Sequence, residues 1–468
     1  MHRRAFLDAV VRAGALATSG LIPAGVLLAQ RAPALDRLIV HSDRPEDVET
    51  PAHLLTSWIT PNELFYVRSH FYTPSIQESA WRLRIGGDVD RTLDLSLSDL
   101  RQMPSATLVV TLECAGNGRA LFEPPVAGIP WRKGAVGTAR WTGVRLAELL
   151  RRAGVKAGSR HIWLDGADRG LGRAPDFIRN VPLEKAMHAD TLLAYQMNGE
   201  ALPVSHGFPL RAIVPGWEGA YSVKWLTDVH VAAREHEGAF VQGGYRYPKR
   251  PVTPGAVVAA ADTAPLTGLI VKSLITTPAA DAGVQPGRVR IAGFAWSGED
   301  EIDRVDISTD HGRTWTAARL GRDRAPYAWR QFEFEWNAAE PGSRVLLSRA
   351  SNARGHTQPI VAEWNPAGYL WNAIDQVRVN VRAPGAVETR QATPPISPVP
   401  PSGGDPEAAE LLSRCFGCHD RRLIESQRLT RAGWTRELDK MIGWGANLTE
   451  AERDKLAVYL SGTFGPAR

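Results

Sequence analysis

The 468-residue sequence predicts a multidomain protein, in which an α+β domain is followed by a β-sandwich and a small all-α domain. Three observations predict this order. Short apolar runs mix with an amphipathic helix over residues 38–252, and apolar residues alternate singly with polar ones over 253–383. Helical patterns fill residues 405–468. A chain of this length can hold two or three domains, each with its own core.

The first 30 residues are similar to an export signal. Arg3 and Arg4 precede a weakly apolar segment rich in Ala and Gly, which is typical of twin-arginine export. A chance arginine pair is the alternative. The segment falls short of the ~20 strongly apolar residues of a membrane span, and no later segment reads as a span. We therefore expect a periplasmic protein that is exported already folded.

Composition limits the kinds of partner. Charged residues make up 22% and hydrophobic residues 44%, which is ordinary for a globular protein. The net charge of +5 is spread along the chain without a block of Lys and Arg. The sequence therefore favours a small anionic ligand or an acidic partner over nucleic acid.

Residues 38–252 contain Cys114, which has no neighbouring cysteine for a disulfide because the other two lie far downstream. Cys114 follows the apolar run 108–110 and precedes a turn containing Gly116 and Gly118, so we place it at the end of a buried strand. It is either a small buried hydrophobe or a thiolate ligand to a metal. Further along, residues 144–153 form the clearest helix, and frequent Gly and Pro exclude long ones.

Polar residues that suit an anion occur on both sides of Cys114. Upstream, Arg68 and His70 share one face of a predicted strand; an exposed arginine and a satisfied histidine at a strand edge are the alternative. Downstream, loops rich in Gly and Pro carry side chains that could hold a phosphate by charge-assisted hydrogen bonds: His206, Arg211, Ser222 and Lys224.

Alternating apolar residues mark the second domain. Val289 and Ile291, then Val305 and Ile307, read as strands, and the turn at 310–312 follows the second pair. Strands at short, regular spacing are typical of an immunoglobulin-like β-sandwich.

The last domain follows a Pro-rich linker over 384–404, which cannot bury a core. Asp405 is a suitable N-cap for the first helix, and Thr449 and Glu452 have capping-box spacing for the last helix. A domain of about 60 residues with few apolar core residues needs a covalent or metal link to be stable.

The sequence Cys415-Phe-Gly-Cys418-His419 supplies this link, because it is the attachment motif of a c-type haem. It predicts a small cytochrome c domain. A redox-active cysteine pair or half of a zinc site is the alternative. Met441 is the one methionine after Met197, so it must be the second axial ligand if the iron is His/Met ligated. It could also be a core residue, which would leave the iron five-coordinate.

The order and spacing of these motifs resemble the sulfite oxidase family of molybdenum enzymes. The matching stretches run from about Asn62 to Asn372 and include NELFYVRSH, TLECAGNGR, WTGVRLAELL, LLAYQMNGE, HGFPLRAIVPG, SVKWL and VDISTDHGRTW. The resemblance implies that the β-sandwich is a dimerisation domain, and hence a homodimer. It also implies oxidation of sulfite to sulfate, with electrons leaving through the haem to an external acceptor, such as a soluble cytochrome c.

The resemblance also implies roles for individual residues. Cys114 would bind the molybdenum of a single molybdopterin, whose pterin and phosphate would be held by His206, Arg211, Ser222 and Lys224. The substrate pocket would be lined by Arg68, His70, Arg119 and Tyr245, with Tyr247 as the alternative tyrosine. These expectations come from the family and not from the spacing.

Two departures bear on the substrate. Gly118 stands where many members have an arginine, and Ala367 stands where animal sulfite oxidases carry a pocket arginine. The second change moves the sequence toward the sulfane dehydrogenases, which act on sulfur carried by a partner protein. An electron-transfer protein without turnover is the remaining alternative, and the pocket residues argue against it.

Overall fold

The computed structural model describes residues 37–383 and 405–466. The predicted signal segment, the linker and the last two residues lie outside this range. No helix in the described part of the chain has the length and apolar character needed to cross a bilayer.

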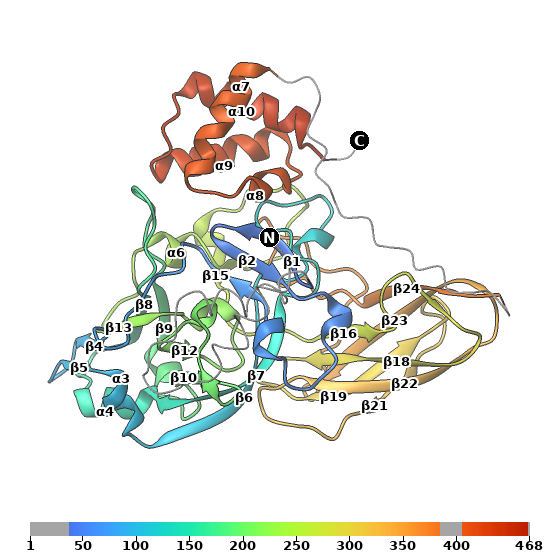
Figure 1. Ribbon diagram of the computed structural model, residues 1–468, viewed down its shortest axis with the longest axis horizontal. Helices are drawn as coiled ribbons and strands as arrows, with labels where there is room; N and C mark the ends of the chain where they lie inside the picture. Colours follow the sequence, from blue (N-terminus) through green and yellow to red (C-terminus); the bar gives the residue numbers. More distant parts are fainter. Residues whose placement is uncertain (1–36, 384–404, 467–468) are drawn as a thin grey trace, which may run out of the picture. The chain divides into compact units, whose positions relative to one another are not determined.

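Three sheets build the first domain (Figure 1). A small antiparallel sheet joins β1 (Ile39–Asp43), β2 (Glu46–Glu49) and β3 (Val67–Arg68). The second sheet has the order β11-β10-β7-β6, with β12 paired to β10: β6 (Ser105–Glu113), β7 (Val136–Arg145), β10 (Leu192–Met197), β11 (Glu200–Ala201) and β12 (Arg211–Ile213). The third has the order β5-β4-β13-β8-β9: β4 (Leu83–Gly87), β5 (Leu93–Leu95), β8 (His161–Gly166), β9 (Arg179–Pro182) and β13 (Leu226–Ala232).

Short helices connect these strands, as the frequent Gly and Pro predict. They are α3 (Leu97–Arg101), α4 (Leu146–Ala153), α5 (Leu183–Ala186), α6 (Ala239–Gln242) and the 3-10 turns Ala52–Leu54, Asn62–Leu64, Arg119–Leu121, Val204–His206, Gly219–Tyr221 and Ala260–Asp262. The predicted helix 144–153 begins two residues late, because Val144 still pairs with Ser105 in the sheet. Gly154 ends the helix with φ of 73°, a conformation that glycine adopts without strain.

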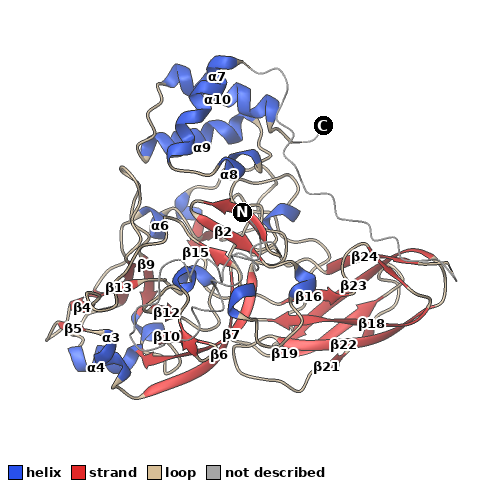
Figure 2. Ribbon diagram, in the orientation of Figure 1, coloured by secondary structure: helices blue, strands red, loops and turns tan. Residues whose placement is uncertain are grey.

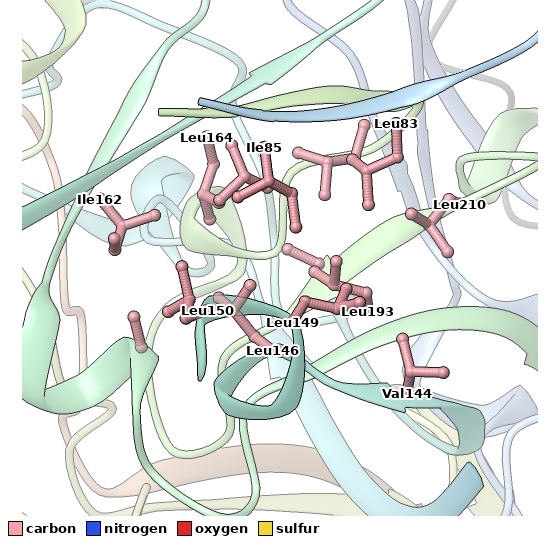
Figure 3. Packing of buried hydrophobic residues seen from close by; sticks show 14 of the residues in the cluster. Leu83, Ile85, Val144, Leu146, Leu149, Leu150, Ile162, Leu164, Leu193 and Leu210 are labelled. Atoms are coloured by element: carbon pink, nitrogen blue, oxygen red, sulfur yellow. The ribbon is translucent and has the colours of Figure 1, made fainter. Parts of the chain in front are cut away.

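The core of the first domain lies between α4 and two of its sheets (Figure 3). Leu146, Leu149 and Leu150 point from the helix toward Leu83 and Ile85 on β4, and all five are fully buried. Burial of large aliphatic side chains contributes about 1.5–3 kcal/mol each relative to exposure. This core extends to the cavity, because it includes the cavity-lining Val223, and a second apolar cluster contains Leu112 and Cys114.

The predicted β-sandwich is present, with two stacked sheets (Figure 2). One sheet has the order β16-β18-β22-β21: β16 (Lys272–Thr277), β18 (Gly287–Trp296), β21 (Arg319–Leu320) and β22 (Arg330–Ala338). The other has the order β17-β24-β23-β19-β20: β17 (Ala282–Val284), β19 (Ile302–Ser308), β20 (Thr316–Ala317), β23 (Gly342–Asn352) and β24 (Asp375–Val381). Ahead of the sandwich, β14 (Arg246–Pro248) and β15 (Thr263–Pro265) form a two-stranded ribbon.

Residues 405–466 are helical (Figure 2). Their elements are α7 (Pro406–Ser413), a 3-10 turn (Arg414–Gly417), α8 (Arg421–Glu425), α9 (Arg431–Gly443) and α10 (Glu450–Thr463). Both predicted caps form: Asp405 accepts from the Glu407 and Ala408 N–H groups, and Thr449 and Glu452 make a reciprocal capping box. The caps satisfy N–H groups that a helix N-terminus leaves unpaired.

Candidate active site

A cavity opens beside Cys114, between the first domain's sheets and the loops that follow them. Its volume is about 570 Å³ when the opening to solvent is included. It is lined by Phe65, Tyr66, Val67, Arg68, His70, Leu112, Cys114, Phe177, Ser205, His206, Arg211, Glu218, Gly219, Ala220, Ser222, Val223, Lys224 and Tyr245. Eight of the nine residues predicted for cofactor or substrate therefore meet in one cavity, although they come from distant parts of the chain.

Cys114 lies at the end of β6, as predicted, directly after the last paired residue Glu113. Its N–H donates to the Ala135 carbonyl at 2.9 Å, and its carbonyl accepts from the Asn117 N–H at 2.8 Å. Burial raises the pKa of the thiol, while the charges of Arg119 and Arg68 act in the opposite direction. A bound metal cation would stabilise the thiolate further, so the position suits a sulfur ligand.

Two cations sit on the opposite wall of the cavity. The Arg211 guanidinium donates to the carbonyls of His206 and Ser222, both at 2.9 Å, and its Nε is buried without a partner. Lys224 Nζ donates to Ser69 Oγ at 2.8 Å and to the Ser205 carbonyl at 2.9 Å. These partners are neutral, so neither cation gains a carboxylate by these bonds.

Burying these two cations is unfavourable, and their pKa values are lowered as a result. Burial, followed by repulsion from Arg211, lowers the pKa of Lys224 to about 7, and burial lowers the pKa of Arg211 to about 10. An anionic group in the cavity would offset both effects by charge-assisted hydrogen bonds. The donor set and the buried Arg211 Nε therefore fit a phosphate-bearing cofactor such as molybdopterin.

His70 and Tyr245 form a hydrogen-bonded pair, with 2.7 Å between His70 Nε2 and Tyr245 Oη. The His70 ring stacks on Phe177 at 4.0 Å between centroids. Burial and the charges of Arg68 and Arg179 hold the pKa of His70 well below its usual value, and burial raises the pKa of Tyr245 well above its usual value. Both side chains are therefore neutral near pH 7, and a single hydrogen bond joins the two uncharged groups.

Tyr245 has a backbone φ of 54°, a left-handed conformation that a bulky residue rarely adopts. Strained positions of this kind cluster at functional sites. The alternative tyrosine, Tyr247, is on β14 and does not line the cavity. The geometry thus favours Tyr245 over Tyr247.

Arg68 lines the cavity, but the strand predicted to carry both Arg68 and His70 is too short. Strand β3 ends at Arg68, where its pairing with β2 stops, so His70 enters the cavity from a loop. The Arg68 guanidinium bonds the buried Asp47 carboxylate at 3.1 Å and the Ser69 carbonyl. Asp47 thus fixes the orientation of a cation that is still 25% exposed toward the cavity.

Arg119 does not line the cavity. Its Nε donates to the Ala367 carbonyl at 3.1 Å, and its Nη1 donates to the Ile129 carbonyl at 2.9 Å. The guanidinium carbon lies 5.5 Å from the ring centre of Tyr369. Arg119 therefore places a positive charge beside Ala367, although residue 367 itself carries none.

Arg179 does not line the cavity but lies next to Tyr245, which does, and the sequence does not reveal it. It is 2% exposed, and its guanidinium carbon lies 4.5 Å from the ring centre of Tyr245 and 4.4 Å from that of Tyr221. Arg179 Nη2 lies 3.9 Å from Glu218 Oε1. Burial raises the pKa of Glu218 to about 7. Neither Arg179 nor Glu218 belongs to a recognisable motif, so no signal in the sequence could have found them.

The Cys415 motif lies in the turn between α7 and α8. The N–H groups of Cys418 and His419 both donate to the Cys415 carbonyl, which brings the three side chains onto one short turn. His419 Nε2 is 3.5 Å from Met441 Sδ on α9, and His419 Nδ1 is buried without a partner. Within 405–466, Trp434 and Leu438 are buried whereas Met441 is partly exposed, so Met441 is not a plain core residue.

None of the three cysteines forms a disulfide. In the described ranges, no group of three or more His, Cys, Asp and Glu side chains is arranged to hold a metal ion. His419 and Met441, which face each other across the segment, are the two residues predicted as haem ligands.

Two sequence families match the chain. "Oxidoreductase molybdopterin binding domain" covers residues 70–240, and "Mo-co oxidoreductase dimerisation domain" covers residues 264–382. Neither match reaches the helical segment 405–466. The two matched ranges coincide with the α+β domain and the β-sandwich of the structure.

Several curated proteins are similar over the same part of the chain. "Sulfite oxidase" of Gallus gallus is 39% identical over 352 residues, which are 72% of this chain and 76% of that protein. "Sulfite oxidase, mitochondrial" of Homo sapiens is 38% identical over 371 residues, 75% of this chain and 66% of that protein. "Sulfite oxidase" of Arabidopsis thaliana is 32% identical over 377 residues, 74% of this chain and 95% of that protein.

A solved structure is similar as well. The sulfane dehydrogenase SoxCD from Paracoccus pantotrophus superimposes with a TM-score of 0.64 at 30% identity, over 73% of this chain and 88% of that chain. Both enzyme types weighed from the sequence are thus represented among the similar proteins.

Proposed function

Since this chain belongs to the sulfite oxidase family of molybdopterin enzymes, we propose that it oxidises sulfite to sulfate at a molybdenum centre bound by Cys114. The overall reaction is sulfite plus water to sulfate, two protons and two electrons. The single observation that carries the proposal is the cavity, which brings Cys114, the cations Arg68, Arg211 and Lys224, and the pair His70–Tyr245 together. When bound, the molybdopterin supplies the two-electron acceptor.

The side chains of the pocket bind and orient the substrate. Arg68, held by Asp47, presents donors to a small dianion and offsets the cost of removing it from water. Arg119 and Arg179 add positive charge from behind the wall without needing to move. The neutral pair of His70 and Tyr245 can donate or accept one proton beside the substrate oxygens. Arg211, Lys224, His206 and Ser222 hold the pterin phosphate.

The helical segment 405–466 would carry the electrons away. Cys415 and Cys418 would attach a c-type haem by thioether bonds, and His419 and Met441 would be its protein ligands. Such a haem would supply a one-electron route to an external acceptor, a soluble cytochrome c. The protein acts in the periplasm after twin-arginine export, and the dimerisation family match at 264–382 supports a homodimer.

The second candidate is a sulfane dehydrogenase, whose substrate sulfur is bound to a carrier protein. The similarity to the SoxCD structure and the alanine at position 367 favour it. A dianion would lose one arginine that the animal enzymes present at that position. The position of Arg119 against the Ala367 carbonyl restores a charge there and supports free sulfite as the substrate.

The test mixes oxidised full-length protein with sulfite alone in a stopped-flow instrument, follows the haem absorbance, and measures molybdenum in the same preparation. We expect about one molybdenum per chain and haem reduction that a Cys114→Ser variant slows by more than about 1,000-fold. Molybdenum without haem reduction by sulfite, but with reduction by a carrier-bound persulfide, would replace sulfite oxidation with the sulfane reaction. A protein without molybdenum would overturn both.

A further inference from the structure

The residue before Cys114 is a buried carboxylate that the active-site cavity does not include. Glu113 is the last residue of β6 and is 1% exposed. Glu113 Oε1 accepts from Lys272 Nζ at 2.6 Å and from Asn117 Nδ2 at 2.9 Å, and Glu113 Oε2 accepts from Trp296 Nε1 at 2.8 Å. Three donors therefore fix a side chain adjacent in sequence to the sulfur that would bind the metal.

Two of these donors belong to the β-sandwich. Lys272 begins β16 and Trp296 ends β18, and the two residues pair with each other in the sandwich sheet. They are 4% and 3% exposed, so removing either one leaves a buried carboxylate oxygen of Glu113 without that hydrogen bond. The sandwich thus donates two buried hydrogen bonds, one from an ammonium group and one from an indole N–H, to the residue that precedes Cys114.

The third donor, Asn117, lies on the other side of Cys114 in the same loop. Asn117 Oδ1 accepts from the Ala135 N–H at 3.1 Å, and the Asn117 carbonyl lies 3.4 Å from Lys272 Nζ. The Cys114 N–H and carbonyl are also bonded, to Ala135 and Asn117. Hydrogen bonds therefore anchor the backbone on both sides of the sulfur, and Lys272 contacts both anchors.

We infer that Glu113, Lys272 and Trp296 position Cys114 for metal binding, so that the β-sandwich holds the metal-binding loop in addition to any part in dimerisation. The inference rests on the proposed function, because it takes Cys114 as the metal ligand. A buried, fully paired carboxylate has one permitted geometry, whereas a loop held only by backbone bonds could move the sulfur. Residues that hold a ligand in place typically change metal affinity by about 10–100-fold when removed.

A second lysine provides the matched control. Lys133 also joins the first domain to the sandwich, because its Nζ bonds Asp375 Oδ1 on β24 at 2.5 Å and the Gln376 carbonyl at 3.0 Å. Asp375 is as buried as Glu113, at 0% exposure. The Lys133 ammonium bonds no atom of the 113–117 segment, so Lys133→Met removes an interdomain ion pair without releasing the loop.

The experiment compares Lys272→Met, Trp296→Phe, Lys133→Met and the double variant Lys272→Met/Glu113→Gln as full-length proteins. One readout is molybdenum per chain after purification. The other is the rate of iodoacetamide alkylation of Cys114 in protein expressed without the cofactor, with the modified peptide identified by mass spectrometry. Thermal unfolding of each variant is followed in parallel.

We expect Lys272→Met to speed Cys114 alkylation by about tenfold or more and to lower molybdenum content, with a smaller change for Trp296→Phe. The double variant, which no longer buries an unpaired carboxylate, should recover most of both losses. Lys133→Met should lower the unfolding temperature without changing either readout. Equal alkylation rates in all variants, or equal changes for Lys133→Met and Lys272→Met, would overturn the inference. Since the alkylation needs neither molybdenum nor sulfite, its result does not depend on the proposed reaction.

Discussion

The pocket around Cys114 takes its side chains from strands and loops spread over more than 150 residues, whereas Cys415, Cys418 and His419 come from a single turn. The pocket stands on apolar packing between α4 and the sheets, and most of its polar groups have protein partners. Buried side-chain atoms without a partner occur in both places, Arg211 Nε in the pocket and His419 Nδ1 in the helical segment. The difference lies in the framework, because the pocket rests on a large apolar core whereas the helical segment has a small one.

The largest expected effect tests the dependence of the helical segment on its haem. In a Cys415→Ala/Cys418→Ala variant no thioether can form, and residues 405–466 should lose their helical structure, because so small a core needs a staple. Molybdenum content and sulfite oxidation with ferricyanide as acceptor should stay close to wild type. Circular dichroism, metal analysis and the ferricyanide assay measure the three quantities. Loss of molybdenum in this variant would show that the two sites are not independent.

A smaller effect is expected from changing one pocket residue while the fold stays intact. Arg68→Gln should raise the KM for sulfite by about 10–100-fold, because a charge-assisted contact to a dianion is lost. The same change leaves the buried Asp47 carboxylate unpaired and lowers stability. The double variant Arg68→Gln/Asp47→Asn should recover the stability and keep the high KM. Recovery of both would mean that Arg68 acts through the fold and not on the substrate.

The smallest effect concerns the free energy of keeping a cation buried in the preformed pocket. Lys224 has a pKa of about 7 in the folded protein, and an unfolded lysine has one near 10.5. Between these values the unfolded chain binds more protons, so this group makes stability rise with pH from about 7 to 10. Below pH 7 the folded protein carries the full cost of the buried charge.

We therefore expect a cofactor-free Lys224→Met variant to gain stability relative to wild type at pH 6, and this gain to shrink by roughly 3 kcal/mol by pH 9. Urea unfolding at both pH values measures the difference. Glu218 titrates near the same pH but is present in both proteins, so its contribution cancels. A difference that does not change with pH would contradict the expectation.

Local patterns predict the features that depend on neighbouring residues. The apolar run before Cys114 and the glycines after it indicate a strand end, and β6 does stop at Glu113. The capping box of Thr449 and Glu452 likewise forms as its spacing predicts. The strand through Arg68 and His70 was wrong in length, because pairing with β2 ends at Arg68 and no local pattern encodes that limit.

Features that depend on distant pairing escape the sequence. Lys272 begins a strand whose other residues are apolar or hydroxyl-bearing, and nothing near it indicates that its partner Glu113 lies 159 residues earlier. Arg179 reaches Tyr245 only because β9 begins beside the loop that carries the tyrosine. Both residues bear on the site through tertiary contacts alone, and so the structure was needed to find them.

The hydrogen bond from Arg119 to the carbonyl of residue 367 has a consequence for how the pocket can diversify. A backbone carbonyl is the same whatever side chain the residue carries, so mutation at 367 can change that side chain while the guanidinium stays in place. Selection could then exchange a small side chain for a large or charged one at this position without first losing the resident cation. The side chain at 367 could thus change substrate preference, while Arg119 keeps attracting anions.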